Sequence, residues 1–78
     1  MADHAFGKVL QRLRKSKGLS QEELSLLSGL DRTFISRLEG GQRQPTISTV
    51  IKLAEALNVS AASIVAEVED LINENKSD

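Results

Sequence analysis

The strongest constraint on the fold is a pair of helix starts that lie close together in the chain. Ser20 begins a capping box, in which its hydroxyl accepts a hydrogen bond from the Glu23 amide and the Glu23 carboxylate reaches back to the start of the helix. Gly29 can adopt a positive φ and end that helix, and Asp31 can cap the next one. The stretch therefore predicts a short helix, a tight turn and a second short helix.

Apolar residues recur at helical spacing along the rest of the chain, and no segment alternates as a strand would. Gly18 can end a first helix as a left-handed cap, and Asn58 ends a fourth helix whose apolar stripe includes Ile47 and Ile51. Ser60 can cap a fifth helix. The sequence predicts an all-α fold of five helices at about 3–17, 21–28, 32–39, 47–57 and 61–73.

The core of such a fold must be built mainly from aliphatic side chains. The chain has 78 residues, no Cys and two Phe, so it has neither disulfides nor extensive aromatic packing. We expect Leu24 and Leu27 to face the core from the second helix, and Ile35 and Leu38 from the third. The length predicts a single domain, residues 1–78, with residues 74–78 frayed.

No stretch of the sequence is apolar for the roughly eighteen residues needed to span a bilayer, and the N-terminus lacks a signal-peptide core. We therefore expect a cytoplasmic protein without a membrane partner.

The charge of the chain is unevenly distributed. The formal net charge is −1, but residues 1–54 hold nine Lys and Arg against five Asp and Glu, whereas residues 55–78 hold one against six. Phosphate attraction by basic side chains dominates non-specific DNA affinity, so the basic part alone is suited to nucleic acid.

The two short helices and their turn have the spacing of a helix-turn-helix, a motif that also occurs in proteins that do not bind DNA. With Ile35 and Leu38 facing inward, the helical period places a set of polar side chains outward. Arginine can bind guanine with two hydrogen bonds, and Thr and Ser can bond to several bases. The candidate base-recognition residues are Arg32, Thr33, Ser36 and Arg37.

Several segments together resemble the lambda-repressor-like (Cro/repressor-type, XRE family) helix-turn-helix domains. They include Gly18 to Leu24, Ile35 to Glu39, Pro45-Thr46 and Leu53 to Val59. The stretch from Gly29 to Glu39, in so short a chain, is similar to the controller proteins of restriction-modification systems. The resemblance implies a transcriptional regulator that binds a palindromic operator in double-stranded DNA as a homodimer, through the major groove.

The resemblance also implies roles for individual residues. Gln21 would bind a phosphate at the start of the second helix, and Arg43 would lie near a phosphate or a groove edge. Phe34 would contact a thymine methyl or the DNA backbone, or else pack beside Ile35. Arg14 and Glu39 would form a partly buried ion pair with a structural role.

The last helix, about 61–73, carries a long apolar stripe for a helix that otherwise has acidic surroundings. This stripe is either core or, together with the fourth helix, a two-fold dimer interface, in which case the operator is palindromic. The candidate interface residues are Ile64, Val65, Val68, Leu71 and Ile72.

Other functions fit the sequence less well. One His, no Cys and no glycine-rich phosphate loop predict neither an enzyme nor a metal site, and we expect no cofactor and no small-molecule substrate. The main alternative is an antitoxin-type interaction module that binds a toxin through the acidic residues 67–78 as well as DNA, although that segment is short for a disordered tail. A monomeric coactivator-type domain is a third alternative.

Overall fold

Five helices follow one another in the computed structural model, which describes the backbone of residues 2–76 and the side chains of residues 4–74. No strand occurs within residues 2–76. The all-α, five-helix prediction is confirmed. The helices are α1 (Ala2–Ser16), α2 (Gln21–Ser28), α3 (Arg32–Glu39), α4 (Ile47–Leu57) and α5 (Ala61–Lys76).

The boundaries of α2, α3 and α4 agree with the expected ranges, and those of α1 and α5 differ at their ends. Helix α1 ends at Ser16, because Lys17 and Gly18 form the turn that follows. Helix α5 continues to Lys76, so residues 74–76, which were expected to be frayed, are helical. Residues 77–78 lie outside the described range.

Local hydrogen bonds set the ends of α2 and α3. The Glu23 amide donates to the Ser20 hydroxyl at 3.0 Å, and the Ser20 amide donates to the Glu23 carboxylate at 2.8 Å, which completes the capping box. Gly29 has φ 74° and ends α2. The Asp31 carboxylate then accepts a hydrogen bond from the Thr33 amide at 3.1 Å. The turn therefore has the geometry that the sequence predicts.

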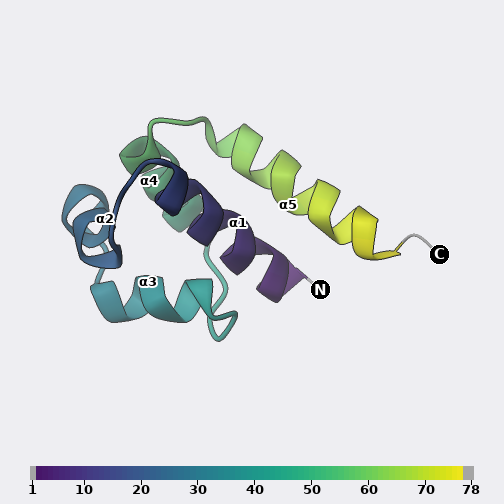
Figure 1. The fold of residues 1–78 in the computed structure, drawn as a ribbon, viewed down its shortest axis with the longest axis horizontal. Coiled ribbons are helices and arrows are strands. Elements are labelled where there is room, and N and C mark those ends of the chain that lie inside the picture. Colours follow the sequence, from purple (N-terminus) through teal and green to yellow (C-terminus); the bar gives the residue numbers. More distant parts are fainter. Residues whose placement is uncertain (1, 77–78) are drawn as a thin grey trace.

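The helices pack in a connected set (Figure 1). Helix α1 packs against both α3 and α5, α2 packs against α3 and α4, and α4 packs against α5. Helix α5 extends along the long axis of the molecule, whose dimensions are 40 × 23 × 23 Å. In the described part of the chain no single helix is long and apolar enough to cross a bilayer. Helices α4 and α5 pass that test only as a pair, by length and composition, and are bent by 108°.

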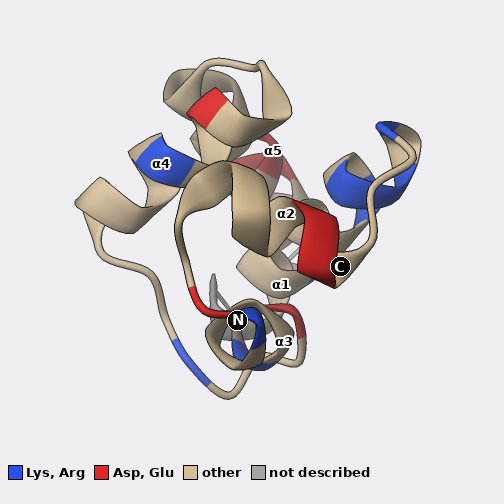
Figure 2. Ribbon diagram, turned by 90° about the vertical axis from the view of Figure 1, so that its left-hand side faces the viewer, with Lys and Arg blue, Asp and Glu red and all other residues tan. Residues whose placement is uncertain are grey.

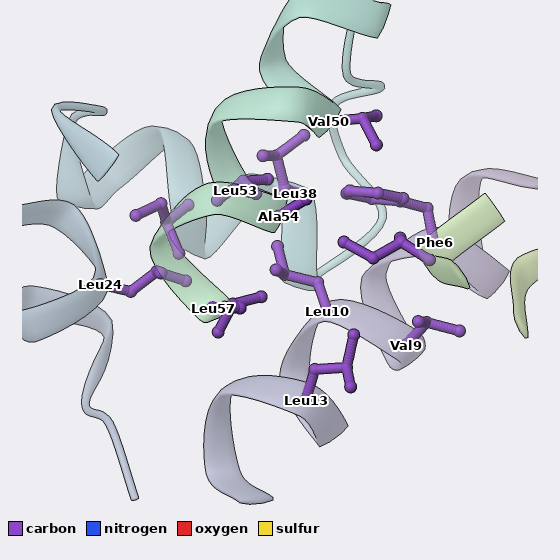
Figure 3. Packing of buried hydrophobic residues seen from close by; sticks show 12 residues of the cluster. Phe6, Val9, Leu10, Leu13, Leu24, Leu38, Val50, Leu53, Ala54 and Leu57 are labelled. Carbon is purple, nitrogen blue, oxygen red and sulfur yellow. The ribbon is translucent and has the colours of Figure 1, made fainter. Parts of the chain in front are cut away.

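Side chains from all five helices meet in one apolar core (Figure 3). Full burial of an aliphatic side chain stabilises a fold by about 1.5–3 kcal/mol, so a few such residues hold each short helix in place. Helix α3 contributes two of them and α2 contributes one. The largest fully buried side chains are Leu10, Leu24, Ile35, Leu38, Leu53, Leu57 and Ile64.

The inward prediction for Leu27 is wrong, because this side chain is 60% exposed. Only Leu24 of α2 is fully buried, and the partly buried residues beside it are polar. The Ser25 hydroxyl donates to the Leu30 carbonyl at 2.5 Å, and the Leu30 amide donates to the Ser28 hydroxyl at 3.2 Å. The packed side of α2 therefore consists of Leu24 and the two serines that bond to the turn. Leu27 lies outside it, at the surface.

Two residues of the apolar stripe expected on α4 are also exposed. Ile47 and Ile51 lie at the surface, whereas Val50, Leu53, Ala54 and Leu57 are buried. The apolar stripe of α4 is therefore wider than the surface that α4 buries against the core, and its Ile47 and Ile51 edge remains accessible to solvent.

Candidate nucleic-acid interface

Helix α3 has one buried face and one exposed face. Ile35 and Leu38 are completely buried and hold the helix against the core. The four candidate base-recognition residues, Arg32, Thr33, Ser36 and Arg37, are all exposed. The outward face of α3 therefore offers arginine and hydroxyl groups at successive helical turns.

The C-terminal end of α3 is fastened by an ion pair with α1. Nε of Arg14 lies 2.6 Å from Oε2 of Glu39, and Nη2 lies 3.0 Å from Oε1, which gives a bidentate pair. The two side chains are only 9% and 3% exposed. The hydrogen bonds that Arg14 donates to the Glu39 carboxylate raise the pKa of Arg14 above its ordinary value, although burial acts in the opposite direction. The ion pair therefore favours the charged form of the guanidinium.

Two further contacts make this pair the centre of a small polar cluster, which we call the Arg14–Glu39 cluster: Arg14, Leu19, Gln21 and Glu39. Nη1 of Arg14 donates to the Leu19 carbonyl at 2.7 Å, just before the start of α2. Nε2 of Gln21 donates to Oε1 of Glu39 at 3.1 Å. The cluster therefore fixes α1, the start of α2 and the end of α3 relative to one another.

The Gln21 side chain, which the family resemblance implies would bind a phosphate, also has a partner inside the chain. Its Nε2 donates one of two N–H groups to Glu39, so the second N–H group and the amides at the start of α2 remain for a phosphate, where the helix dipole favours an anion. Residues 21 and 39 are far apart in the sequence, so no local pattern predicts this contact.

Gly7 marks a second close contact between α1 and the end of α3, and the sequence analysis did not identify it. A Cβ atom added at Gly7 would lie 2.5 Å from the carbonyl oxygen of Leu38 and 2.6 Å from that of Glu39. The two backbones approach so closely that no side chain fits between them. A glycine inside an otherwise helical pattern was the available signal, because such glycines often have a packing reason.

The loop between α3 and α4 returns to the exposed face of α3. The amides of Gln42 and Arg43 both donate to the Arg37 carbonyl, at 2.9 and 3.3 Å. The guanidinium carbon of Arg43 lies 5.5 Å from the centre of the Phe34 ring. Phe34 is half-buried and packs against the core, so the aromatic ring joins the core to the loop.

The basic groups on this side of the molecule form one surface. Lys and Arg segments lie on α3 and on the loop that follows it, at the bottom of the view in Figure 2. Three of these residues, Arg32, Arg37 and Arg43, are exposed. Four of the acidic residues of the C-terminal part, Glu67, Glu69, Asp70 and Glu74, lie instead on α5, which packs mainly against α1 and α4. The uneven charge of the sequence therefore becomes a basic α3 face and an acidic α5. No group of His, Asp or Glu side chains in the described residues is arranged to hold a metal ion.

The candidate interface residues of α5 do not share one face. Ile64 is 1% exposed and belongs to the core of its own chain, so its side chain is not available to a dimer interface. Leu71 lines a groove toward α1. Val65, Val68 and Ile72 line a shallow hollow on another side, and Val65 is 48% exposed.

Known proteins resemble this chain over most of its length. A family model described as helix-turn-helix matches residues 10–64. The uncharacterized HTH-type transcriptional regulator y4dJ of Sinorhizobium fredii is 42% identical over 64 residues, which cover 82% of this chain and 83% of the relative.

Two solved structures share the fold with substantial sequence identity. The restriction-modification controller protein C.AhdI from Aeromonas hydrophila is 44% identical, with a TM-score of 0.77, over 80% of this chain and 94% of that one. The controller protein C.Esp1396I, solved as a tetramer in complex with its natural 35 base-pair operator, is 30% identical, with a TM-score of 0.82, over 90% and 92% of the two chains. In sequence and in fold, this chain belongs to the helix-turn-helix family.

Proposed function

We propose that this chain is a sequence-specific DNA-binding transcriptional regulator that binds a palindromic operator as a homodimer. The observation that carries the proposal is the rigidly held outward face of α3, on which Arg32, Thr33, Ser36 and Arg37 are exposed. The operator complex of C.Esp1396I, which shares the fold, supports DNA as the ligand. The antitoxin alternative has no comparable support among the relatives described above.

The dimensions of α3 suit the DNA major groove. An α-helix with its side chains is about 10–12 Å across, and the groove is about 12 Å wide, so the eight-residue α3 can enter it. Arginine at the start of the helix can donate two hydrogen bonds to guanine O6 and N7, while Thr33 and Ser36 can bond to neighbouring bases. Arg43 and the start of α2 would bind the flanking phosphates.

Replacement of Arg32 by alanine is expected to reduce discrimination at one base position per half-site by about 1–3 kcal/mol, because one bidentate contact is lost. Selection of bound sequences from random duplex DNA, with wild type and variant in parallel, measures this directly. Lys52→Ala is the matched control, because it removes the same charge from an exposed site on α4. An Arg32→Ala protein with the base preference of wild type would contradict the assignment.

The dimer interface is proposed on the exposed and partly exposed apolar residues of α4 and α5. Val65, Val68 and Ile72 line one hollow of α5, and Ile47 and Ile51 are the exposed edge of the α4 stripe. A two-fold contact here would place two α3 helices about one DNA turn, roughly 34 Å, apart. Two modest half-site affinities then combine, which compensates for the low net charge.

Replacement of Val65 by glutamate is expected to weaken dimerisation at least about tenfold, since each copy loses the burial of an apolar side chain and gains a charge to desolvate. Sedimentation equilibrium without DNA measures the dissociation constant. Leu26→Glu is the matched control, because Leu26 is an 80% exposed apolar residue on α2. A dimer unaffected by Val65→Glu would place the interface elsewhere.

We further propose that the chain acts in the cytoplasm as a regulator and catalyses no reaction. The most specific form of the proposal is a restriction-modification controller protein, supported by the 44% identity to C.AhdI. A methyltransferase or endonuclease gene beside the coding sequence, with an operator upstream that the purified protein protects from nuclease, would test this role.

A further inference from the structure

We propose that Phe34 is a positioning residue whose ring holds the Arg43 guanidinium in place to bind a DNA phosphate. The inference rests on the proposed function and extends it, because it assigns the aromatic residue of α3 a role that acts through the loop rather than through a base. The observation behind it is the 5.5 Å separation between Cζ of Arg43 and the centre of the Phe34 ring.

The Phe34 ring, which we call the platform for Arg43, is held in one position by the core. It is half-buried and packs against the core cluster, next to the completely buried Ile35. A ring with one side packed against the core has few alternative orientations, and its other side is accessible to the loop. A cation within about 6 Å of such a ring is attracted by the negative charge density of the ring face.

The backbone of Arg43 is held as well as its side chain. Its amide donates to the Arg37 carbonyl at 3.3 Å, beside the 2.9 Å bond from Gln42. Gly41, with φ 77°, makes the reversal that brings the loop back to α3. The main chain and the guanidinium are therefore each attached to α3, although Arg43 lies outside the helix.

The contact with the ring leaves the binding capacity of the guanidinium intact. The ring attracts the guanidinium through its charge and uses none of the five N–H donors in a conventional hydrogen bond, so these donors remain available to another partner. An in-plane fork of donors matches two phosphate oxygens. A long side chain that is already ordered also loses less conformational entropy on binding than one in a mobile loop. The arrangement therefore raises phosphate affinity without a direct contact between Phe34 and DNA.

The platform can be tested in the free protein by NMR. In wild type, the Arg43 δ and ε protons are expected to be shifted upfield by the ring current of Phe34. The shift is expected to persist in Phe34→Tyr, which keeps the ring, and to disappear in Phe34→Leu. Arg43 resonances that are the same in wild type and in Phe34→Leu would overturn the proposal. This test needs no DNA, so its outcome is independent of the proposed function.

A double-mutant cycle on the selected operator tests the functional consequence. Phe34→Leu is expected to weaken binding about two- to fivefold in the wild-type background, the range typical of a cation–π contact near the surface, and to have no effect in an Arg43→Ala background. Phe34→Tyr is expected to restore wild-type affinity. Circular dichroism and thermal unfolding of each variant establish that the fold is retained, and Lys52→Ala controls for loss of one positive charge.

The cycle distinguishes Phe34 as a platform from Phe34 as a DNA contact. If the effects of Phe34→Leu and Arg43→Ala multiply, the two residues act independently, and the positioning role is contradicted. The slope of log affinity against log salt is expected to decrease by about one for Arg43→Ala. Wild type that binds no DNA would contradict the proposed function, while the NMR result would still decide whether the platform exists.

Discussion

Replacement of Arg14 by alanine is expected to lower the free energy of unfolding by about 3–5 kcal/mol, the cost typical of removing one partner of a buried ion pair. The change leaves the Glu39 carboxylate, whose side chain is 3% exposed, without its guanidinium. It also leaves the Leu19 carbonyl without the hydrogen bond from Nη1. Urea unfolding at a fixed protein concentration measures the effect, because dimerisation would make the apparent stability concentration-dependent.

The same helix provides a matched control. Arg12 pairs with Glu67 across α1 and α5, but these side chains are 60% and 35% exposed. Arg12→Ala is therefore expected to cost less than about 1 kcal/mol. The double variant Arg14→Met and Glu39→Leu is expected to regain much of the loss, because it strands no charge. If Arg14→Ala costs no more than Arg12→Ala, the Arg14–Glu39 cluster does not hold α3 in place.

The helices and the turn could be predicted because their signals are local. The Ser20 capping box, Gly29 with positive φ and the Asp31 cap each act within a few residues, so the sequence contains all the partners. The exposed and buried faces of α3 follow from the period of the helix once Ile35 is assigned to the core. Most of the candidate base-recognition surface therefore needed no tertiary information.

The division of α5 between core and surface could not be predicted in the same way. Ile64 and Val65 are neighbours in the sequence, and they lie toward opposite edges of one broad apolar stripe. Which edge is buried depends on where α1 packs, and that position is set by distant residues. The contacts of Gln21 with Glu39 and of Arg43 with Phe34 have the same origin, since each joins segments that meet only in the folded chain.

Gly7 allows the contact between α1 and α3 to be tested by a single added methyl group. Alanine is favoured over glycine inside a helix by about 1 kcal/mol, so helix propensity alone predicts that Gly7→Ala stabilises the protein. We expect the opposite, a loss of about 3 kcal/mol, at the upper end of the usual range for overpacking. The reason is that the obstructing atoms, the Leu38 and Glu39 carbonyl oxygens at 2.5 and 2.6 Å, belong to backbone and cannot rotate away. Thermal unfolding measures the sign.

Gly40→Ala is the control for Gly7→Ala, since it makes the same substitution at the other side of the same junction. Gly40 has φ −81°, and an added Cβ would lie 3.4 Å from the Ser36 carbonyl oxygen, an ordinary contact, so alanine is expected to be neutral or to stabilise by about 0.4–1 kcal/mol. If Gly7→Ala follows Gly40→Ala and stabilises the protein, the close approach does not constrain α3. If it destabilises and also weakens operator binding while the exposed α3 residues are unchanged, the spacing between α1 and α3 sets the position from which Arg32 and Arg37 reach the DNA.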